Sequence, residues 1–348
     1  MRAVLFEEFG GRPEVVTVPD PVAPPGGVVV RVAATGLCRS DWHGWRGHDP
    51  DIRVPHVPGH EFAGVVASVG PGVTRVRAGD RVTAPFVYGC GRCPVCLAGQ
   101  HQVCPHQSQP GFTRWGSFAE YVVVDNAEVN LVPLPDEVDF RVAAALGCRF
   151  ATAFRAVVAQ GRVAAGEWVA VFGCGGVGLS AVMIAAASGA RVVAVDVSDQ
   201  ALAMARDCGA TRTVDASDRA DPAAVAAAVR EATGGGAHLS LDALGSHDTC
   251  AAALRGLRRQ GRHVQVGLLP AVLGPPPLPM DLVIGHELEI RGSHGMAAHA
   301  YPELLGLITG GVLEPARLVT RSITLDEAPE ALATLDRPGA PGIRLIEL

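Results

Sequence analysis

Residues 167–178 read EWVAVFGCGGVG and decide how the second half of the chain is organised. An apolar run ends in the pattern G-x-G-x-x-G, at Gly173, Gly175 and Gly178, and a helical stretch, LSAVMIAAASGA, follows directly. A bare glycine pattern is weak evidence, but between a strand and a helix it is typical of a turn that approaches a pyrophosphate group. The next strand, RVVAVD, ends in Asp196, about twenty residues further on, which completes the pattern of a dinucleotide-binding unit.

This turn and the acid after it predict a cofactor and the groups that bind it. The helix that begins here, with Gly176 and Val177 in its first turn, would direct its positive end at the phosphates. Asp196 would accept hydrogen bonds from the adenosine ribose and repel a 2′-phosphate. Because no arginine stands in 197–199 to bind that phosphate, the sequence favours NAD(H) over NADP(H). The alternative is that Asp196 is an ordinary strand-end or capping acid.

Strands and helices continue to alternate downstream. Apolar strands read AHLSLDAL at 237–244 and GRHVQVGLL at 261–269, and an alanine-rich helical stretch covers 223–230. This alternation predicts a doubly wound parallel sheet, the Rossmann type, which we place at 151–290. The last segment, 291–348, contains a helical YPELLGLITGG and a closing strand GIRLIEL, and we expect it to return to the first domain.

Residues 1–150 have β character instead. Short apolar runs such as GGVVVRVAATG, EFAGVVASVG and SFAEYVVV are separated by proline, glycine and aspartate. This pattern is typical of a barrel-like antiparallel domain. The length of 348 residues agrees with a chain of about two domains.

Composition narrows the possible partners. The formal net charge is −6 and the pI is near 6.0, which argues against nucleic acid as a partner. All 29 positive residues are arginine, so Schiff-base chemistry and a phosphate-loop lysine are excluded. The start, MRAVLFEEFG, lacks a signal-peptide pattern, and glycines interrupt the uncharged run 168–190, so we expect no membrane span and a cytoplasmic location. Nine cysteines in such a chain favour metal binding or catalysis over disulfides.

Four of these cysteines stand close together in YGCGRCPVCLAGQHQVCP, residues 88–105. Their spacing is C-x2-C-x2-C-x7-C, with the thiols at Cys90, Cys93, Cys96 and Cys104. Two-residue gaps let thiolates converge, and four sulfurs close a tetrahedral site without an open position, so a structural zinc is predicted. An iron–sulfur cluster, which also uses C-x2-C-x2-C, is the alternative, although the continuation typical of ferredoxins is missing.

A second set of metal-binding side chains lies in 36–61, which starts with GLCRSDWH and ends with PGHE. Cys38 and His60 are two of the three protein ligands that a catalytic zinc requires, while its fourth position stays open for water or substrate. The third ligand must come from elsewhere in the chain.

Together with the four-cysteine lobe, the segments GLCRSDWH, PGHEFAGVV, LGCRFATAF and VFGCGGVG follow one another in an order that resembles a known family. It is the zinc-dependent alcohol dehydrogenase family of the medium-chain dehydrogenase/reductase superfamily. The resemblance covers nearly the whole chain, and the set of segments is specific although each alone is not. It implies a GroES-like catalytic domain joined to the Rossmann domain, with two Zn²⁺ per chain.

The resemblance also implies roles at the metal. Cys148 matches the third zinc-binding thiol; by itself it would more often be a buried packing residue. Glu61 matches an acid that can approach the metal or briefly replace its water. Asp41 matches the carboxylate that orients the histidine ligand and so fixes its tautomer and basicity. A helix cap is the alternative role for Asp41.

A proton path and further cofactor contacts follow from the same resemblance. Ser40 would pass a proton through the cofactor ribose to His43 and on to solvent; a plain surface histidine is the alternative for His43. Trp42 occupies a place that is often acidic in the family, so the solvent end of the relay is expected to differ here. The other implied contacts are Arg39 at the pyrophosphate, Thr152 at the nicotinamide and Arg344 near the phosphates, with a solvated strand residue as the alternative for Arg344.

The expected activity is hydride transfer between an alcohol and NAD, giving an aldehyde or ketone. Trp45, Phe86 and Trp115 are candidates for an apolar substrate wall, which would favour aliphatic or aromatic alcohols. A polyol dehydrogenase and a specialised carbonyl or imine reductase are alternatives within the fold. A zinc- and NAD-binding redox sensor without turnover is the alternative from another class. Because the family forms dimers and tetramers, we expect a homodimer or a homotetramer.

Overall fold

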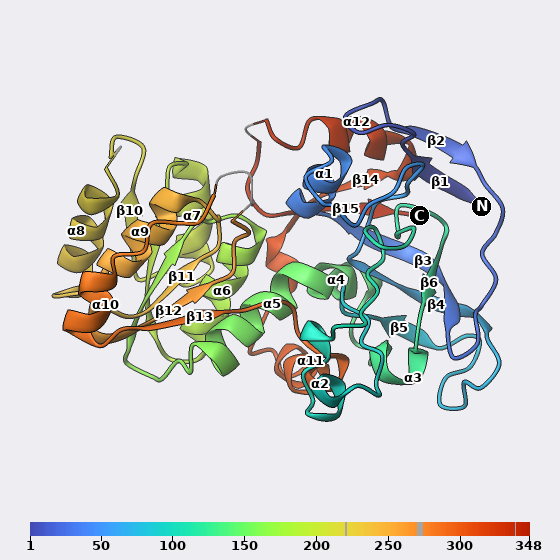
Figure 1. Ribbon diagram of the computed structural model, residues 1–348, viewed down its shortest axis with the longest axis horizontal. Coiled ribbons are helices and arrows are strands. Elements are labelled where there is room, and N and C mark those ends of the chain that lie inside the picture. Colours follow the sequence, from blue (N-terminus) through green and yellow to red (C-terminus); the bar gives the residue numbers. More distant parts are fainter. Residues whose placement is uncertain (220, 270–273, 338) are drawn as a thin grey trace. The chain divides into compact units, whose positions relative to one another are not determined.

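The computed structural model describes residues 1–219, 221–269, 274–337 and 339–348 (Figure 1). The chain divides into two compact units, and each is described by itself. Unit 1 comprises Met1–Ala151, Gly295–Gly339 and Ile343–Leu348, and unit 2 comprises Thr152–His294 and Ala340–Gly342.

Unit 2 is built on a six-stranded sheet in which all neighbouring strands are parallel. Its strand order is β10-β9-β8-β11-β12-β13. The strands are β8 (Trp168–Phe172), β9 (Arg191–Asp196), β10 (Arg212–Asp215), β11 (Ala237–Asp242), β12 (Leu257–Gln265) and β13 (Glu289–Gly292). β8 buries every residue, as expected of a strand that is covered on both faces. The doubly wound parallel sheet predicted from the sequence is confirmed.

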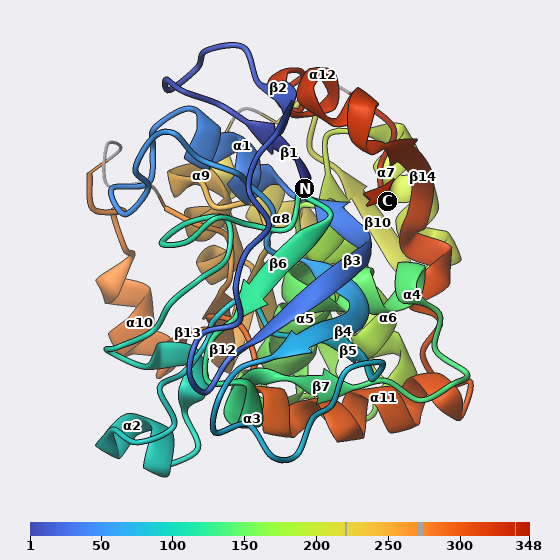
Figure 2. The ribbon, with the colours of Figure 1, turned by 90° about the vertical axis from the view of Figure 1, so that its right-hand side faces the viewer.

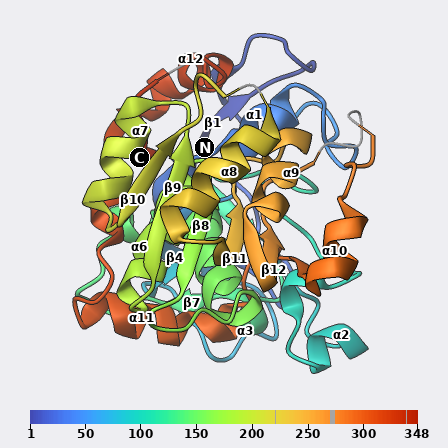
Figure 3. The same cartoon turned by 90° about the vertical axis from the view of Figure 1, so that its left-hand side faces the viewer.

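Helices cover this sheet in two layers, of which α8 and α9 are in front in Figure 3. The helices are α6 (Gly176–Ala187), α7 (Asp199–Asp207), α8 (Pro222–Thr233), α9 (His247–Arg255) and α10 (Met280–His286). α6 and α7 pack on each other and on β8, β9 and β10, whereas α8 and α9 form a second packed pair. The strand order reverses between β8 and β11, and doubly wound sheets bind ligands beyond the carboxyl ends of the strands at such a point.

The turn after β8 has a backbone shape that depends on its glycines. Gly173 has φ = +88°, which favours glycine over residues with a Cβ. Gly178, in the first turn of α6, lies directly against it, and a Cβ there would collide with the carbonyl oxygen of Gly173. The last glycine of the pattern therefore allows α6 to pack closely on β8.

Unit 1 contains a seven-stranded, mainly antiparallel sheet in the order β14-β15-β3-β4-β5-β7, with β6 also paired to β3 (Figure 2). The strands are β3 (Val28–Leu37), β4 (Phe62–Val69), β5 (Arg81–Thr83), β6 (Tyr121–Val124), β7 (Val132–Pro133), β14 (Val319–Thr324) and β15 (Ile343–Glu347). β1 (Arg2–Leu5) and β2 (Glu14–Thr17) form a separate antiparallel pair. β15 lies antiparallel to β3, so the end of the chain joins the sheet formed by its beginning.

The helices of unit 1 are short and lie around this sheet. They are α1 (Arg39–Trp45), α2 (Pro94–Leu97), α3 (Ala127–Asn130), α4 (Phe140–Ala145), α11 (Tyr301–Thr309) and α12 (Ala328–Ala333). One apolar core forms between β3, β4 and β6, with Phe62 and Tyr88 among its largest members. A second core joins β1 to α12 and β15 and includes Phe6 and Leu37.

α4 and α5 (Ala151–Phe154) belong to one helical stretch, Phe140–Gln160, which has π-helical turns at Leu146–Phe150 and Arg155–Gln160. By length and composition this stretch of 21 residues could cross a membrane, with a mean hydropathy of 1.5. However, 72% of its most apolar window is buried inside the structure, as in the core helix of a globular protein. π-helical turns are rare and often mark functional sites, and the first of them carries Cys148.

Candidate active site

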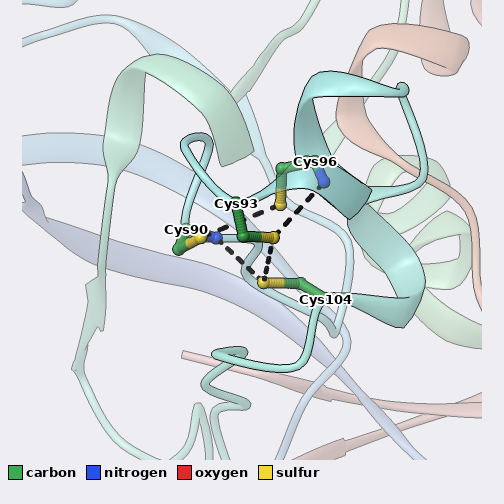
Figure 4. A group of neighbouring side chains, drawn as sticks. All are labelled: Cys90, Cys93, Cys96 and Cys104. Atoms are coloured by element: carbon green, nitrogen blue, oxygen red, sulfur yellow. Dashed lines mark hydrogen bonds between the residues drawn. The ribbon is translucent and has the colours of Figure 1, made fainter.

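The four cysteines of the 88–105 lobe converge on one point (Figure 4). Their sulfur atoms all lie within 4.8 Å of one another, with Cys93 Sγ 3.8 Å from Cys104 Sγ and Cys90 Sγ 4.0 Å from Cys96 Sγ. α2 begins directly after Cys93, so Cys96 returns one turn later and its backbone N–H donates to Cys93 Sγ at 3.4 Å. The two-residue spacing thus produces the convergence expected from the sequence.

Backbone N–H groups around the lobe favour thiolates over thiols. The backbone N–H of Arg92 lowers the pKa of Cys90 to about 6. Cys104 Sγ accepts hydrogen bonds from the N–H groups of Cys90 at 3.4 Å and His106 at 3.3 Å. Burial, by contrast, raises the pKa of Cys96 to about 12, so all four sulfurs can be anionic together only beside a cation. This set of donors fits a structural Zn²⁺.

A second cluster brings the ligand atoms of Cys38, His60, Glu61 and Cys148 within 4.8 Å of one another. Cys38 follows β3 directly, and His60 and Glu61 immediately precede β4. Because β3 and β4 are antiparallel neighbours, the end of one strand meets the start of the other. Cys148 reaches the same point from the π-helical turn Leu146–Phe150. The residues predicted as ligands from three separate segments are therefore neighbours in the structure.

Asp41 organises this cluster through three hydrogen bonds. Its Oδ1 accepts from His60 Nδ1 at 2.8 Å and from the Gly59 N–H at 3.0 Å, and its Oδ2 accepts from the Cys38 N–H at 2.9 Å. Both roles considered for Asp41 thus coincide, because one oxygen caps α1 and the other orients the imidazole. Nδ1 of His60 donates to this carboxylate, so in the neutral imidazole Nε2 carries the lone pair. Among the described residues, this buried Nε2 has no hydrogen-bond partner, which fits a metal ligand.

The two thiols of the cluster are also arranged for a metal. A hydrogen bond from Cys148 holds the pKa of Cys38 well below its usual value, against the opposite effect of burial. The same hydrogen bond and burial raise the pKa of Cys148 well above its usual value. A cation that binds both sulfurs would displace this shared proton, since zinc binds thiolates.

Glu61 has a partner that the sequence did not predict. Its Oε1 accepts from the backbone N–H of Arg149 at 2.9 Å and from Arg149 Nε at 3.0 Å. Its Oε2 forms an ion pair with Arg149 Nη2, and Arg149 Nη1 donates to the Leu37 carbonyl oxygen at 3.2 Å. The only signal in the sequence was the position of Arg149 directly after a predicted ligand.

The residues expected to move protons lie on α1. Ser40 Oγ is 3.8 Å from Cys38 Sγ. His43 Nδ1 is 2.9 Å from His48 Nδ1, and the Trp42 ring packs edge-on against both imidazoles. Burial, followed by the charges of His48 and Arg39, lowers the pKa of His43 below 6.5. Sequence reasoning missed His48, which follows His43 by five residues on the loop after α1.

Aromatic rings flank the predicted zinc-binding imidazole. The Phe86 ring centroid lies 6.1 Å from that of His60, and the Phe112 centroid lies 5.2 Å from it. Phe86 was a candidate for the substrate wall, whereas Phe112 was not foreseen. Trp45, another candidate for the wall, belongs to the apolar core cluster that includes Phe6 and Ile52, and its Nε1 donates to the Gly11 carbonyl at 2.7 Å. Trp115 is 39% exposed and donates from Nε1 to the Pro55 carbonyl at 3.1 Å.

The residues expected to bind the cofactor lie in both units. In unit 2, Asp196 Oδ2 accepts from the Cys174 N–H of the glycine-rich turn at 2.6 Å, and Oδ1 accepts from the Ser198 N–H at 2.9 Å. Its carboxylate therefore ties the end of β9 to the glycine-rich turn, whereas the cap of α7 is Ser198. Thr152 Oγ1 is buried and has no hydrogen-bond partner among the described residues.

In unit 1, the two arginines expected at the phosphates both lie beside the Cys38 segment. Arg344 on β15 pairs with Leu37 on β3, so it is next to the residue that precedes Cys38. Arg39 is the first residue of α1, and its guanidinium lies 5.3 Å from the centre of the Trp42 ring.

The fold and the two thiol clusters define a class of protein: a two-domain dehydrogenase with a GroES-like domain and a Rossmann domain. The family model for the alcohol dehydrogenase GroES-like domain matches residues 24–136, and that for zinc-binding dehydrogenase matches residues 176–310. An alcohol dehydrogenase of Geobacillus stearothermophilus is 37% identical over 295 residues, which cover 84% of both chains.

Solved structures agree with this class. Alcohol dehydrogenase TADH from Thermus sp. ATN1 superposes with a TM-score of 0.90 at 33% identity, over 100% of this chain and 99% of the other. A cobalt- and zinc-bound alcohol dehydrogenase from Pyrobaculum aerophilum gives a TM-score of 0.86 at 28% identity, over 100% of this chain and 99% of the other. The chain belongs to the zinc-dependent alcohol dehydrogenase family of the medium-chain dehydrogenase/reductase superfamily, a family of oxidoreductases with small alcohol or carbonyl substrates.

Proposed function

We propose that this chain transfers hydride between an alcohol and NAD(H) and holds two Zn²⁺ ions. Cys38, His60 and Cys148 would hold the catalytic ion, and the four cysteines of the 88–105 lobe would hold the structural one. The observation that carries the proposal is the buried Nε2 of His60, which is oriented through Asp41 and is grouped with two sulfurs. Three protein ligands leave the open position that is typical of a catalytic zinc.

The residues around this position have separate tasks. Bound zinc would supply a Lewis acid that makes an alcohol hydroxyl easier to deprotonate. Asp41 keeps Nδ1 of His60 protonated, so Nε2 remains free to bind the metal. Phe86 and Phe112 cover the imidazole with apolar surface, which would exclude water and favour apolar substrates.

The proton released from the alcohol needs an acceptor that is neutral at the working pH. The lowered pKa of His43 supports this role, because the imidazole stays neutral above that pKa. Ser40, whose hydroxyl lies near Cys38 Sγ, would accept first and pass the proton towards His43. The contact between His43 and His48 supports an exit to solvent at the end of this relay.

For the cofactor we propose NAD(H) rather than NADP(H). Asp196 at the end of β9 would bind the adenosine ribose, and 197–199 contain no arginine that could bind a 2′-phosphate. The glycine-rich turn and the start of α6 would bind the pyrophosphate. The remaining proposed contacts are Arg39, Thr152 and Arg344. The Asp196→Ala change should narrow the preference for NAD over NADP, and an unchanged ratio would defeat this argument.

Assembly and location are also part of the proposal. We expect a cytoplasmic homodimer or homotetramer. Apolar side chains at the edge of the unit 2 sheet support association: Met280 and Ile284 of α10 are 50% and 75% exposed, and Ile290 of the edge strand β13 is 39% exposed. Light scattering after size-exclusion chromatography measures the oligomeric state directly, and a monomer at micromolar concentration would contradict the proposed dimer or tetramer.

A substrate panel tests the proposed activity. The purified chain would be assayed with NAD⁺ and NADP⁺ against primary, secondary and benzylic alcohols, and with the reduced cofactors against the matching carbonyl compounds. NAD-linked turnover of apolar alcohols is the expected result. Selective turnover of polyols or of imines would favour the corresponding alternative, and cofactor binding without hydride transfer would favour the redox sensor.

A further inference from the structure

The ion pair between Glu61 and Arg149 lies beside the proposed zinc ligands and is almost completely enclosed. Glu61 is fully buried, and Arg149, which is 6% exposed, is the one buried arginine among the residues that the structure describes. Three donors of Arg149 contact the carboxylate, and a fourth contacts the Leu37 carbonyl. An arginine keeps its charge in any protein environment and matches a carboxylate with two parallel N–H groups. The positive charge of Arg149 is therefore a permanent feature of the site.

Glu61 is at the same time close enough to compete for the metal. Its carboxylate belongs to the group of ligand atoms that lie within 4.8 Å of one another. Carboxylate oxygen is an ordinary zinc ligand, and two sulfurs, one nitrogen and one oxygen would complete a closed tetrahedron. A closed site has no position for substrate. The chain thus carries a side chain that could shut its own active site.

We propose that Arg149 is a positioning residue that holds Glu61 away from the metal and so keeps the fourth position open. This inference rests on the proposed zinc site of Cys38, His60 and Cys148. Both carboxylate oxygens are bound by Arg149, so a move of Glu61 onto the metal would leave a buried guanidinium without its partner. Leaving one member of a buried ion pair unpaired is costly, which makes the closed arrangement unfavourable.

The backbone around the pair supports this role. The π-helical turn Leu146–Phe150 directs the backbone N–H of Arg149 to Glu61 Oε1. Gly36 on β3 leaves room for the pair, since a Cβ there would collide with Glu61 Oε2 and Arg149 Nη2. A Cβ on Gly147 would lie 3.1 Å from Glu61 Cα, so this glycine also leaves room for Glu61. Two glycines and a π-helical turn therefore accommodate Glu61 in the position that Arg149 sets.

Cobalt substitution tests the proposal without measuring turnover. Zinc would be replaced by Co²⁺, and the visible spectrum would be titrated with imidazole, which binds a cobalt ion that has an open position. The variants are Arg149→Ala, Arg149→Lys and the double variant Arg149→Ala/Glu61→Ala. Arg141→Ala is the matched control, since Arg141 is on the same helical stretch but pairs with Glu347 on the surface.

We expect the wild type and the control to respond alike. Arg149→Ala should bind imidazole at least about tenfold more weakly, because imidazole would first have to displace Glu61 from the metal. Arg149→Lys should lie between them, because lysine keeps the charge but not the paired N–H groups. The double variant should respond like the wild type, since nothing remains to fill the open position. If Arg149→Ala cannot hold cobalt but the double variant can, this result also supports the proposal that Arg149 holds Glu61 away from the metal.

Two results would overturn the inference alone: an unchanged response in Arg149→Ala, or a double variant that is as unresponsive or as metal-poor as the single one. A wild-type protein whose cobalt spectrum ignores imidazole would instead contradict the proposed zinc site. The two failures are therefore distinguishable in one experiment.

Discussion

Replacing Asp41 with asparagine perturbs the proposed metal site through a single atom. The carboxylate accepts three hydrogen bonds, from His60 Nδ1, the Gly59 N–H and the Cys38 N–H, and all three donors are buried with it. Asparagine has one accepting oxygen and an NH₂ group in place of the second oxygen. In one orientation of the amide, its oxygen accepts from His60 and Gly59, and its NH₂ group faces the N–H of Cys38. In the flipped orientation, its oxygen accepts from Cys38, and its NH₂ group faces the donors of His60 and Gly59.

The size of the effect follows from these contacts. A buried N–H that loses its acceptor costs about 1–3 kcal/mol, so we expect the free energy of unfolding to fall by about 2 kcal/mol in the metal-free protein. Loss of the carboxylate also makes the imidazole a weaker ligand, and changes of this kind lower metal affinity by about 10- to 100-fold. The variant should therefore lose the catalytic zinc to a chelator while the 88–105 lobe keeps its own.

Urea unfolding of the metal-free protein and competition with a chelator measure the two effects separately. Asp136→Asn is a suitable control, because Asp136 is fully exposed and its contact with Arg81 is long, at 3.5 Å. An Asp41→Asn variant that matches the control in both measurements would contradict both roles of Asp41. A loss of stability without a loss of zinc affinity would leave only the capping role of Asp41.

Three further changes test other parts of the structure. Gly178→Ala places a Cβ against the Gly173 carbonyl and should lower the free energy of unfolding of the metal- and cofactor-free protein by about 3 kcal/mol. Gly175→Ala, where a Cβ meets open space, should lower it by less than about 1 kcal/mol. Equal losses of the two variants in urea unfolding would contradict the close packing of Gly178 on Gly173. His48→Gln removes a charge that lowers the pKa of His43, so the pKa of His43 should rise. The acid limb of the pH profile of kcat/KM for alcohol oxidation should then move to higher pH. An acid limb that stays in place or moves to lower pH would argue against His43 as the proton acceptor. Cys104→Ala leaves two N–H groups without their sulfur acceptor and should remove the structural zinc and lower the melting temperature, and a variant that retains both metals would disprove the four-sulfur site.

The sequence predicted the features that depend on local spacing. The glycine pattern 173–178 required a strand, a tight turn and a helix, and the structure has β8, the turn and α6 in that order. The two-residue gaps of the 88–105 lobe predicted converging sulfurs for the same reason. Alternation of strands and helices was sufficient for the doubly wound sheet, because each crossover buries one face of a helix on the sheet.

Contacts between distant segments were not predictable in the same way. Glu61 and Arg149 are separated by 88 residues, and their contact depends on a π-helical turn that no residue pattern announces. Phe112 reaches His60 through the tertiary fold alone.

Zinc content and NAD-linked alcohol oxidation, measured for both the wild type and Cys148→Ser, would examine the proposed catalytic metal site itself. Serine keeps the shape of cysteine but does not supply a thiolate. The proposed site predicts two zinc ions per chain and activity in the wild type, and one zinc ion without activity in the variant. Two zinc ions in both proteins, or hydride transfer that persists in the variant, would contradict the assignment of Cys148 as the third ligand.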